Sequence, residues 1–240
     1  WGSPTYFWSK HKKTNFDWWR KRFKRQFALV DLLRLDHFRG LAGYWRVTGN
    51  SQTAINGKWI NSPGRTLLNK VKNDLKVDHL PIIAEDLGVI TPDVEKLRES
   101  FELPGMKILQ FAFDGKEDNP YLPKNIKGEN WVVYTGTHDN STSISWWKCL
   151  DSDSKSRIRN EFDFSDKPSW NLIEIGMNTN ANLFIVPIQD ILSLDDTCRL
   201  NKPGTIKNNW KWKLNQPLDE IEENMRIFSK LGHDSGRIRN

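Results

Sequence analysis

Cysteine and long apolar stretches are scarce in this sequence. Only two cysteines, Cys149 and Cys198, occur among 240 residues, which excludes a disulfide framework and offers no metal-site spacing, so a reducing compartment is expected. No run of roughly 18 apolar residues is present, and no transmembrane helix is predicted. Residues 1–4 lack the basic and apolar regions of a signal peptide, and no Met precedes them. We therefore expect the sequence to begin inside a longer protein.

Nucleotide-binding and histidine-rich metal motifs are also lacking. Neither GxGxxG nor GxxxxGK[ST] follows an apolar stretch, which leaves a nucleotide cofactor without support. The five histidines include no His-x-His or His-x-x-x-His pair. Asp36-His37 and His138-Asp139 nevertheless offer mixed oxygen and nitrogen ligands at predicted strand ends. A metal-dependent barrel hydrolase therefore stays open as an alternative.

The excess of positive charge is concentrated near the start of the sequence. The net charge is +6, and most of the excess lies between Lys10 and Arg25. Within this stretch aromatic residues recur at helical spacing, which predicts an amphipathic helix whose basic side faces solvent. Solvated basic faces are common, so we expect no nucleic-acid partner. Twelve tryptophans are several times the usual share and suit either a core or stacking on sugars.

Apolar and amphipathic segments alternate along the chain. Strands are predicted at 27–36, 80–86, 106–113, 131–139 and 183–188, and helices at 10–25, 65–76, from Thr91 onward, over much of 141–177 and at 218–231. This alternation indicates an α/β fold with a parallel sheet covered by helices. Five strands fall short of the eight in a closed barrel. We expect residues 1–240 to be one incomplete catalytic domain.

Three of the predicted strands end in acidic residues with polar neighbours. Asp36 lies in RLDHFRG, Glu85 in IIAEDLG and Asp139 in TGTHDN. Because the carboxyl ends of parallel strands meet at one edge of a sheet, we expect the three side chains to converge. Cleavage of a glycosidic bond needs an ionised nucleophile and a proton donor, and a third carboxylate can stabilise an electron-poor sugar. The sequence therefore indicates a candidate glycosidase-type site.

The neighbours of each acid suggest its role. Arg34 shares a strand face with Asp36, and a nearby cation favours the ionised carboxylate that a nucleophile requires. Glu85 follows an apolar run, which is a suitable environment for a general acid. His138 precedes Asp139, and its ring is suited to binding a sugar hydroxyl. A structural ion pair between Arg34 and Asp36 remains the alternative at that strand end.

Six segments together resemble one enzyme family. The match is to the amylomaltases, or 4-α-glucanotransferases, of glycoside hydrolase family 77, and it runs from Trp1 to about Leu214. The matching segments are RLDHFRGLAGYW, LPIIAEDLGVITPDV, LPGMKILQFAF, NPYLP, VVYTGTHDN, and NKPGT followed by NWKW.

The resemblance implies a fold and a set of catalytic roles. The fold would be the C-terminal portion, strands four to eight, of a (β/α)8 TIM barrel of the α-amylase clan, with the N-terminal strands absent from this chain. Asp36 would be the nucleophile, Glu85 the general acid/base and Asp139 the transition-state stabiliser. A retaining enzyme of this kind predicts Asp36 and Glu85 carboxyl groups about 5–5.5 Å apart.

Three further residues match substrate-contacting positions of the family. Arg34 and His138 correspond to its Arg and His in the same motifs, and Trp1, in WGSP, would stack on a sugar. The implied activity is transfer of α-1,4-glucan segments among maltodextrin, starch or glycogen-derived chains, without a cofactor, nucleic acid or membrane. The implied location is the cytoplasm, or a plastid in a plant or alga. An α-glucan hydrolase of the same clan and a non-catalytic glucan-binding protein are the alternatives.

Overall fold

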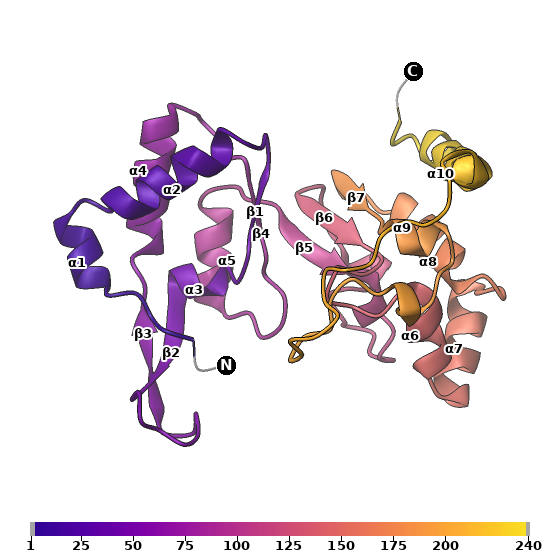
Figure 1. The fold of residues 1–240 in the computed structure, drawn as a ribbon, viewed down its shortest axis with the longest axis horizontal. Helices are drawn as coiled ribbons and strands as arrows, with labels where there is room; N and C mark the ends of the chain where they lie inside the picture. Colours follow the sequence, from indigo (N-terminus) through magenta and orange to yellow (C-terminus); the bar gives the residue numbers. More distant parts are fainter. Residues whose placement is uncertain (1–2, 239–240) are drawn as a thin grey trace. The chain divides into compact units, whose positions relative to one another are not determined.

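The chain forms two compact units, and the computed structural model describes residues 3–238 of it. Unit 1 comprises residues 1–106 and unit 2 residues 107–240. Figure 1 gives the order of their elements along the chain. Within residues 3–238, no helix has both the length and the apolar content needed to cross a membrane. Whether residues 1–240 act as one incomplete catalytic domain stays a prediction.

Unit 1 begins with two helices where one was predicted. Helices α1 (Trp8–Lys13) and α2 (Asp17–Phe27) are separated by a short turn, so the prediction of one continuous helix at 10–25 was wrong. Asn15 and Phe16 have φ angles of 53° and 58°. These left-handed conformations cannot continue a right-handed helix, which explains the break.

Two further helices of unit 1 lie where the sequence predicts them. Helix α4 (Gly64–Leu75) packs against α2 (Figure 1) through its buried apolar residues, and it confirms the helix predicted at 65–76. Helix α5 (Pro92–Glu99) begins after Thr91, as predicted, with Pro92 in its first turn. The Thr91 hydroxyl makes no capping bond to the backbone and instead donates to the Asp93 carboxylate at 2.5 Å. Thr91 therefore occupies the N-cap position without making a capping hydrogen bond.

Unit 1 also contains a parallel pair of short strands. Strands β1 (Leu33–Leu35) and β4 (Ile82–Ala84) pair in parallel, with Leu33 opposite Ile82 and Leu35 opposite Ala84. The predicted strand at 27–36 was too long, because the N–H of Ala28 still bonds to the carbonyl of Lys24 and continues α2. Only the three residues that pair with β4 are extended as a strand.

A β-hairpin that the sequence analysis did not predict follows the short helix α3 (Arg39–Ala42). Its strands are β2 (Gly43–Val47) and β3 (Gly57–Asn61), and Trp45 lies opposite Trp59 with the two rings in edge-to-face contact. A Cβ at Gly57 would come within 2.5 Å of the Trp45 indole nitrogen, so this close packing requires glycine. The cross-strand aromatic pair stabilises the hairpin.

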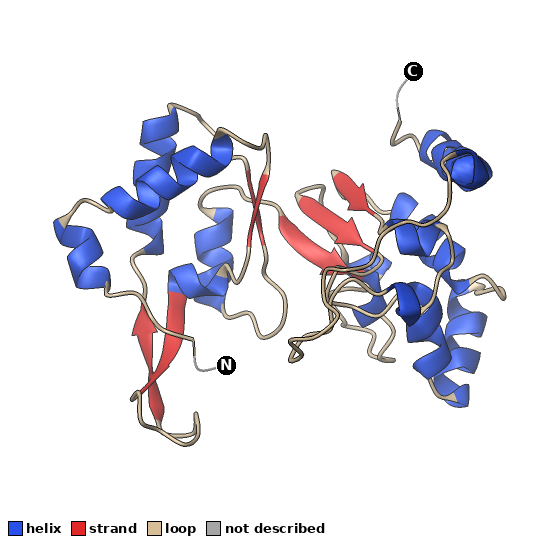
Figure 2. Cartoon of the chain, viewed as in Figure 1, coloured by secondary structure: helices blue, strands red, loops and turns tan. Residues whose placement is uncertain are grey.

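Unit 2 contains a three-stranded sheet with helices gathered beside it (Figure 2). Its strand order is β5-β6-β7, from β5 (Gly105–Ile108), β6 (Trp131–Tyr134) and β7 (Leu183–Ile185), and β5 starts at the end of unit 1. Strands β6 and β7 are parallel, which confirms this part of the predicted sheet. The remaining elements are η1 (Leu109–Phe111), η2 (Pro123–Asn125), α6 (Ser143–Cys149), α7 (Ser152–Phe162), α8 (Pro168–Met177), α9 (Ile188–Ile191), η3 (Asp196–Cys198), η4 (Asp219–Ile221) and α10 (Glu222–Asp234).

The strands of unit 2 are also shorter than predicted. Strand β5 ends at Ile108 and the chain turns into a 3-10 helix, and β6 ends at Tyr134 before the acidic motif. Leu109, Val133 and Leu172 are fully buried in the core that joins the sheet to α8. The segments that follow β6 and β7 therefore leave the sheet as loops or short helices, and these carry polar side chains.

Candidate active site

Asp36 stands directly after β1 and forms an ion pair with Arg34. The distance between Arg34 Nη1 and Asp36 Oδ1 is 2.9 Å, which confirms that the two side chains lie together. The Asp36 side chain is 76% exposed and that of Arg34 is 29% exposed. An ion pair this open to water contributes little to stability, so a purely structural role explains it poorly. The arrangement holds an accessible carboxylate beside a fixed positive charge.

Glu85 lies beside Asp36 because of the parallel register. Leu35 pairs with Ala84, and the N–H of Glu85 bonds to the carbonyl of Leu35 at 3.0 Å. Asp36 and Glu85 are the residues that follow this last pair, so they leave adjacent strands at the same end of the sheet. The predicted neighbourhood of these two acids within unit 1 is therefore confirmed. The predicted carboxyl separation of about 5–5.5 Å stays a prediction.

Backbone N–H groups hold the Glu85 carboxylate in place. Oε2 accepts a hydrogen bond from the N–H of His37 at 2.6 Å, and Oε1 accepts one from the N–H of Leu87 at 3.0 Å. The Glu85 carbonyl also accepts from the N–H of Phe38 at 3.0 Å. His37 adopts a φ of 48°, a left-handed conformation, in the turn that presents its N–H. The turn after β1 thus orients the acid that follows β4.

The neighbouring acid, Asp86, has a different task. Its Oδ1 accepts the N–H of Met106 at 2.8 Å, and its Oδ2 lies 3.3 Å from Nε of Arg98. Both side chains of this ion pair are only 8% exposed. Arg98 also donates to the carbonyl of Leu103 at 3.0 Å. Asp86 therefore ties the turn after β4 to α5 and to the start of β5.

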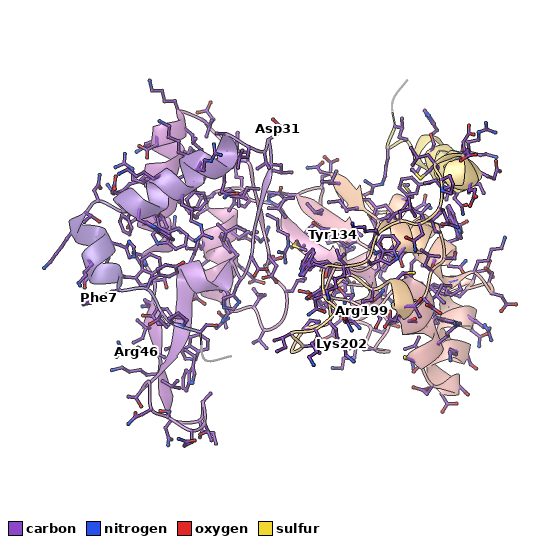
Figure 3. The ribbon with its side chains drawn as sticks, in the orientation of Figure 1. Phe7, Asp31, Arg46, Tyr134, Arg199 and Lys202 are labelled. Carbon is purple, nitrogen blue, oxygen red and sulfur yellow. The ribbon has the colours of Figure 1, made fainter. Side chains whose placement is uncertain are left out.

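Asp139 occupies a loop that we call the Asp139 loop, residues 135–142, between β6 and α6. Asp139 Oδ1 accepts from Asn201 Nδ2 at 2.6 Å, and Oδ2 lies 3.4 Å from Nε2 of His138. Arg199 donates to the Asp139 carbonyl at 2.5 Å and to the hydroxyl of Ser141 at 3.1 Å. Figure 3 labels Arg199 in unit 2, on the segment that follows η3. The carboxylate and its loop are thus held by a segment that comes about 60 residues later in the chain.

His138 is flanked by Asp139 and an aromatic ring. The centroids of the His138 and Trp210 rings are 5.1 Å apart, and Trp210 is 62% exposed. Trp210 belongs to the NWKW segment, so this segment reaches the acidic motif of unit 2. An imidazole beside an exposed indole combines a hydrogen-bonding group with an aromatic surface.

One buried acid of unit 2 was missed by the sequence analysis. Asp190 in α9 is only 1% exposed, and it accepts hydrogen bonds from Thr135 and Ser143. Burial raises the pKa of its carboxyl group, whereas these hydrogen bonds act in the opposite direction. Its signal in the sequence is an acid in VPIQDIL, directly after an apolar strand, the same context as Glu85.

The predicted site residues fall into two groups. Arg34, Asp36 and Glu85 lie together in unit 1, and His138 and Asp139 lie together in unit 2. Trp1 lies outside the described residues. Within residues 3–238, no group of three or more His, Cys, Asp or Glu side chains is placed to hold a metal ion. The two acid–histidine pairs of the metal alternative therefore gain no further ligand in that part of the chain.

Comparisons with known proteins give one consistent match. The model of the glycoside hydrolase family 77, 4-alpha-glucanotransferase, matches residues 1–219. The 4-alpha-glucanotransferase of Synechocystis sp. is 46% identical over 215 residues, which are 89% of this chain and 42% of that protein. The 4-alpha-glucanotransferase of Thermus thermophilus is 40% identical over 222 residues, 89% of this chain and 44% of that protein.

The fold agrees with the sequence match. The amylomaltase of Streptococcus agalactiae, solved in complex with acarbose, is 32% identical and superimposes with a TM-score of 0.90 over 98% of this chain and 48% of its own. The chain thus has the fold of about half of an amylomaltase, and it spans less than half the length of these curated relatives. Because the family model covers 219 of the 240 residues, the chain belongs to the 4-alpha-glucanotransferase family, glycoside hydrolase family 77.

Proposed function

We propose that this chain carries the catalytic carboxylates of a 4-α-glucanotransferase that moves α-1,4-glucan segments between maltodextrin chains. The observation that carries the proposal is the pair Asp36 and Glu85, which leave adjacent parallel strands in a chain of this family. Arg34 neutralises Asp36, and two N–H groups orient Glu85. The proposed mechanism is a retaining double displacement.

In the first step Asp36 attacks the donor glucan. An oxygen of Asp36 forms a bond to C1 of a glucosyl unit while the bond from C1 to the leaving O4 breaks, and Glu85 gives that oxygen its proton. Asp36 suits this role because its side chain is 76% exposed and paired with a cation. The product is a covalent glucanosyl–enzyme with inverted configuration at C1.

In the second step an acceptor sugar releases the glucan. Glu85, now a carboxylate, takes the proton of the acceptor 4-hydroxyl, whose oxygen attacks C1 and expels Asp36. The second inversion restores the original α-configuration. In this scheme Asp139 stabilises the positive charge that develops on the sugar ring in both transition states. Transfer predominates when the site favours a sugar hydroxyl over water.

The remaining site residues bind the sugar in this proposal. Arg34 contacts both the substrate and the Asp36 carboxylate. His138, which lies beside the Trp210 ring, donates a hydrogen bond to a sugar hydroxyl. Trp1 stacks on a glucosyl ring. The side chains of Arg34 and His138 are partly exposed, and each contacts a neighbouring aspartate. These roles are supported because each side chain is held in place and still accessible to a sugar.

The same family match supports a finer fold assignment. We propose that β1, β4, β5, β6 and β7 are strands four to eight of a (β/α)8 barrel. The parallel pairs β1–β4 and β6–β7 support this order. The substrates would be maltodextrin, starch or glycogen-derived glucans, without a cofactor, in the cytoplasm or in a plastid.

Incubation of the full-length protein with maltotriose tests this function. Transfer yields glucose together with a ladder of maltodextrins longer than maltotriose. Shortening without elongation would identify an α-glucan hydrolase instead and overturn the proposal. The variant Asp36→Asn serves as the control and should produce neither pattern, and loss of the ladder on chelation would point to the metal-dependent alternative.

A further inference from the structure

We propose that Asp190 is a positioning residue that fixes both ends of the Asp139 loop and thereby sets the place of the Asp139 carboxylate. The proposal rests on the proposed role of Asp139 in stabilising the transition state. Asp190 itself lies in α9, which follows β7, and is far in sequence from the loop that it holds.

Three hydrogen bonds join Asp190 to the two ends of the loop. Thr135 directly follows β6, and its hydroxyl donates to Asp190 Oδ2 at 2.6 Å. Ser143 is the first residue of α6, and it donates through its N–H to Oδ1 at 2.8 Å and through its hydroxyl to Oδ2 at 2.7 Å. One carboxylate thus connects the point where the chain leaves the sheet with the point where the next helix begins.

Burial makes this connection rigid. Asp190 is 1% exposed, and Thr135 and Ser143 are both 0% exposed. Water therefore does not reach these groups to replace a lost hydrogen bond. A polar group left here without a partner lowers the stability of the folded state. A carboxylate is also well suited to the task, because all three surrounding groups act as donors and its two oxygens only accept.

The segment after Asp190 holds the rest of the loop from the same side. Asp196 accepts the N–H of Thr142 at 2.8 Å, and Arg199 donates to the carbonyl of Asp139 and to Ser141. These contacts lie at or near the surface, since Asp196 and Arg199 have side chains that are 37% and 19% exposed. Asp190 is the fully buried member of this set and anchors it at the sheet.

The test removes one donor without changing the shape of the core. Thr135→Val in the full-length protein replaces a hydroxyl by a methyl group, and Thr135→Ser keeps the hydroxyl. With maltotriose as substrate we expect Thr135→Val to lower kcat about tenfold while KM stays within about twofold, because a misplaced Asp139 weakens only the transition state. Thr135→Ser should restore most of kcat. Thr179→Val, which removes a hydroxyl bonded to Gly176 elsewhere in unit 2, should leave both constants nearly unchanged.

A second measurement separates positioning from a merely structural effect. If Asp190 and Thr135 act through Asp139, then adding Thr135→Val to Asp139→Asn should cause no further loss of kcat. An equal loss in both backgrounds would overturn the proposal, and so would an unchanged kcat in the single variant. If Thr135→Val does not fold, as judged by circular dichroism, Ser143→Ala replaces it with the same expectations. A normal kcat for Asp139→Asn alone would refute the proposed role of Asp139, which is a different failure from that of the positioning proposal.

Discussion

At the residue scale, the acids of this chain differ in their access to solvent and in their partners. Asp36 is open to solvent beside one cation, whereas Asp86 and Asp190 are buried and bonded to groups of the protein itself. A nucleophile has to reach the sugar, and only a carboxylate with an open face can do so. The buried acids instead hold the turns that carry the proposed catalytic groups.

Removing the carboxylate of Asp36 should therefore lower kcat far more than removing the carboxylate of another exposed acid. We expect Asp36→Asn to lower kcat on maltotriose by a factor of roughly 10⁴ or more, because an amide cannot form the glucanosyl ester. Asp31, another exposed acid near the start of β1, provides the matched control. Asp31→Asn should keep kcat within about twofold of the parent. A similar loss in both variants would show that the effect is one of charge or folding rather than of nucleophilic attack.

At the element scale, the turn after β4 depends on a buried ion pair. Arg98 on α5 meets Asp86 at 3.3 Å, and both are 8% exposed. Removing one partner leaves the other charge buried without it, which typically costs about 3–5 kcal/mol. This turn carries Leu87, whose N–H holds Glu85, so the stability of the turn and the orientation of Glu85 are coupled.

The corresponding prediction concerns the free energy of unfolding. Arg98→Met should lower it by about 3 kcal/mol and lower kcat as well, because the turn that orients Glu85 loses its anchor. The double variant Arg98→Met, Asp86→Leu removes both charges, and should regain part of the stability. Denaturant unfolding and maltotriose kinetics check both effects. A single variant as stable as the parent would contradict the importance of this ion pair.

The same elements show what could be read from the sequence. The β/α alternation, helix α4 and the start of α5 were predicted, because apolar periodicity and Pro92 are local signals. The lengths of the strands were not predicted correctly. A strand ends where its pairing with a partner distant in sequence ends, as it does at Leu35 and Ala84. The proximity of Asp36 and Glu85 could be predicted because both residues follow the carboxyl ends of parallel strands. Asp190 was missed because its structural role depends on the hydrogen-bond donors around it. These donors, Thr135 and Ser143, are distant in sequence, and the sequence alone does not show that they contact Asp190.

At the scale of the whole molecule, several aspartates have a pKa that differs from the ordinary value. The hydrogen bonds from Arg20 hold the pKa of Asp74 below its usual range, with distances of 2.5 and 2.6 Å. Hydrogen bonds likewise lower the pKa of Asp93, Asp114, Asp151 and Asp195. Burial acts in the opposite direction on Asp190 and raises its pKa.

The sign of the pH effect follows from these directions. Because the pKa of Asp74 is lower in the folded state, its stabilising contribution is present above the usual Asp range and is lost as the pH falls through the folded-state pKa. We expect Asp74→Asn to be less stable than the parent at pH 7, and this difference to vanish at the acidic end. Thermal unfolding of both proteins between pH 7 and roughly pH 2.5 measures it. A difference that stays constant with pH would contradict the assignment of this pair.

The proposed mechanism passes through a covalent glucanosyl–enzyme, which can be observed directly. In the variant Glu85→Gln of the full-length protein, α-maltosyl fluoride should still glycosylate the enzyme, since fluoride leaves without a proton, while deglycosylation is slowed for lack of a base. Peptide mapping by mass spectrometry then identifies the modified residue. We expect one added maltosyl group on the peptide that contains Asp36, and none when Asp36→Asn is also present. A label on another residue, or turnover of the fluoride to a β-configured product without a label, would contradict it.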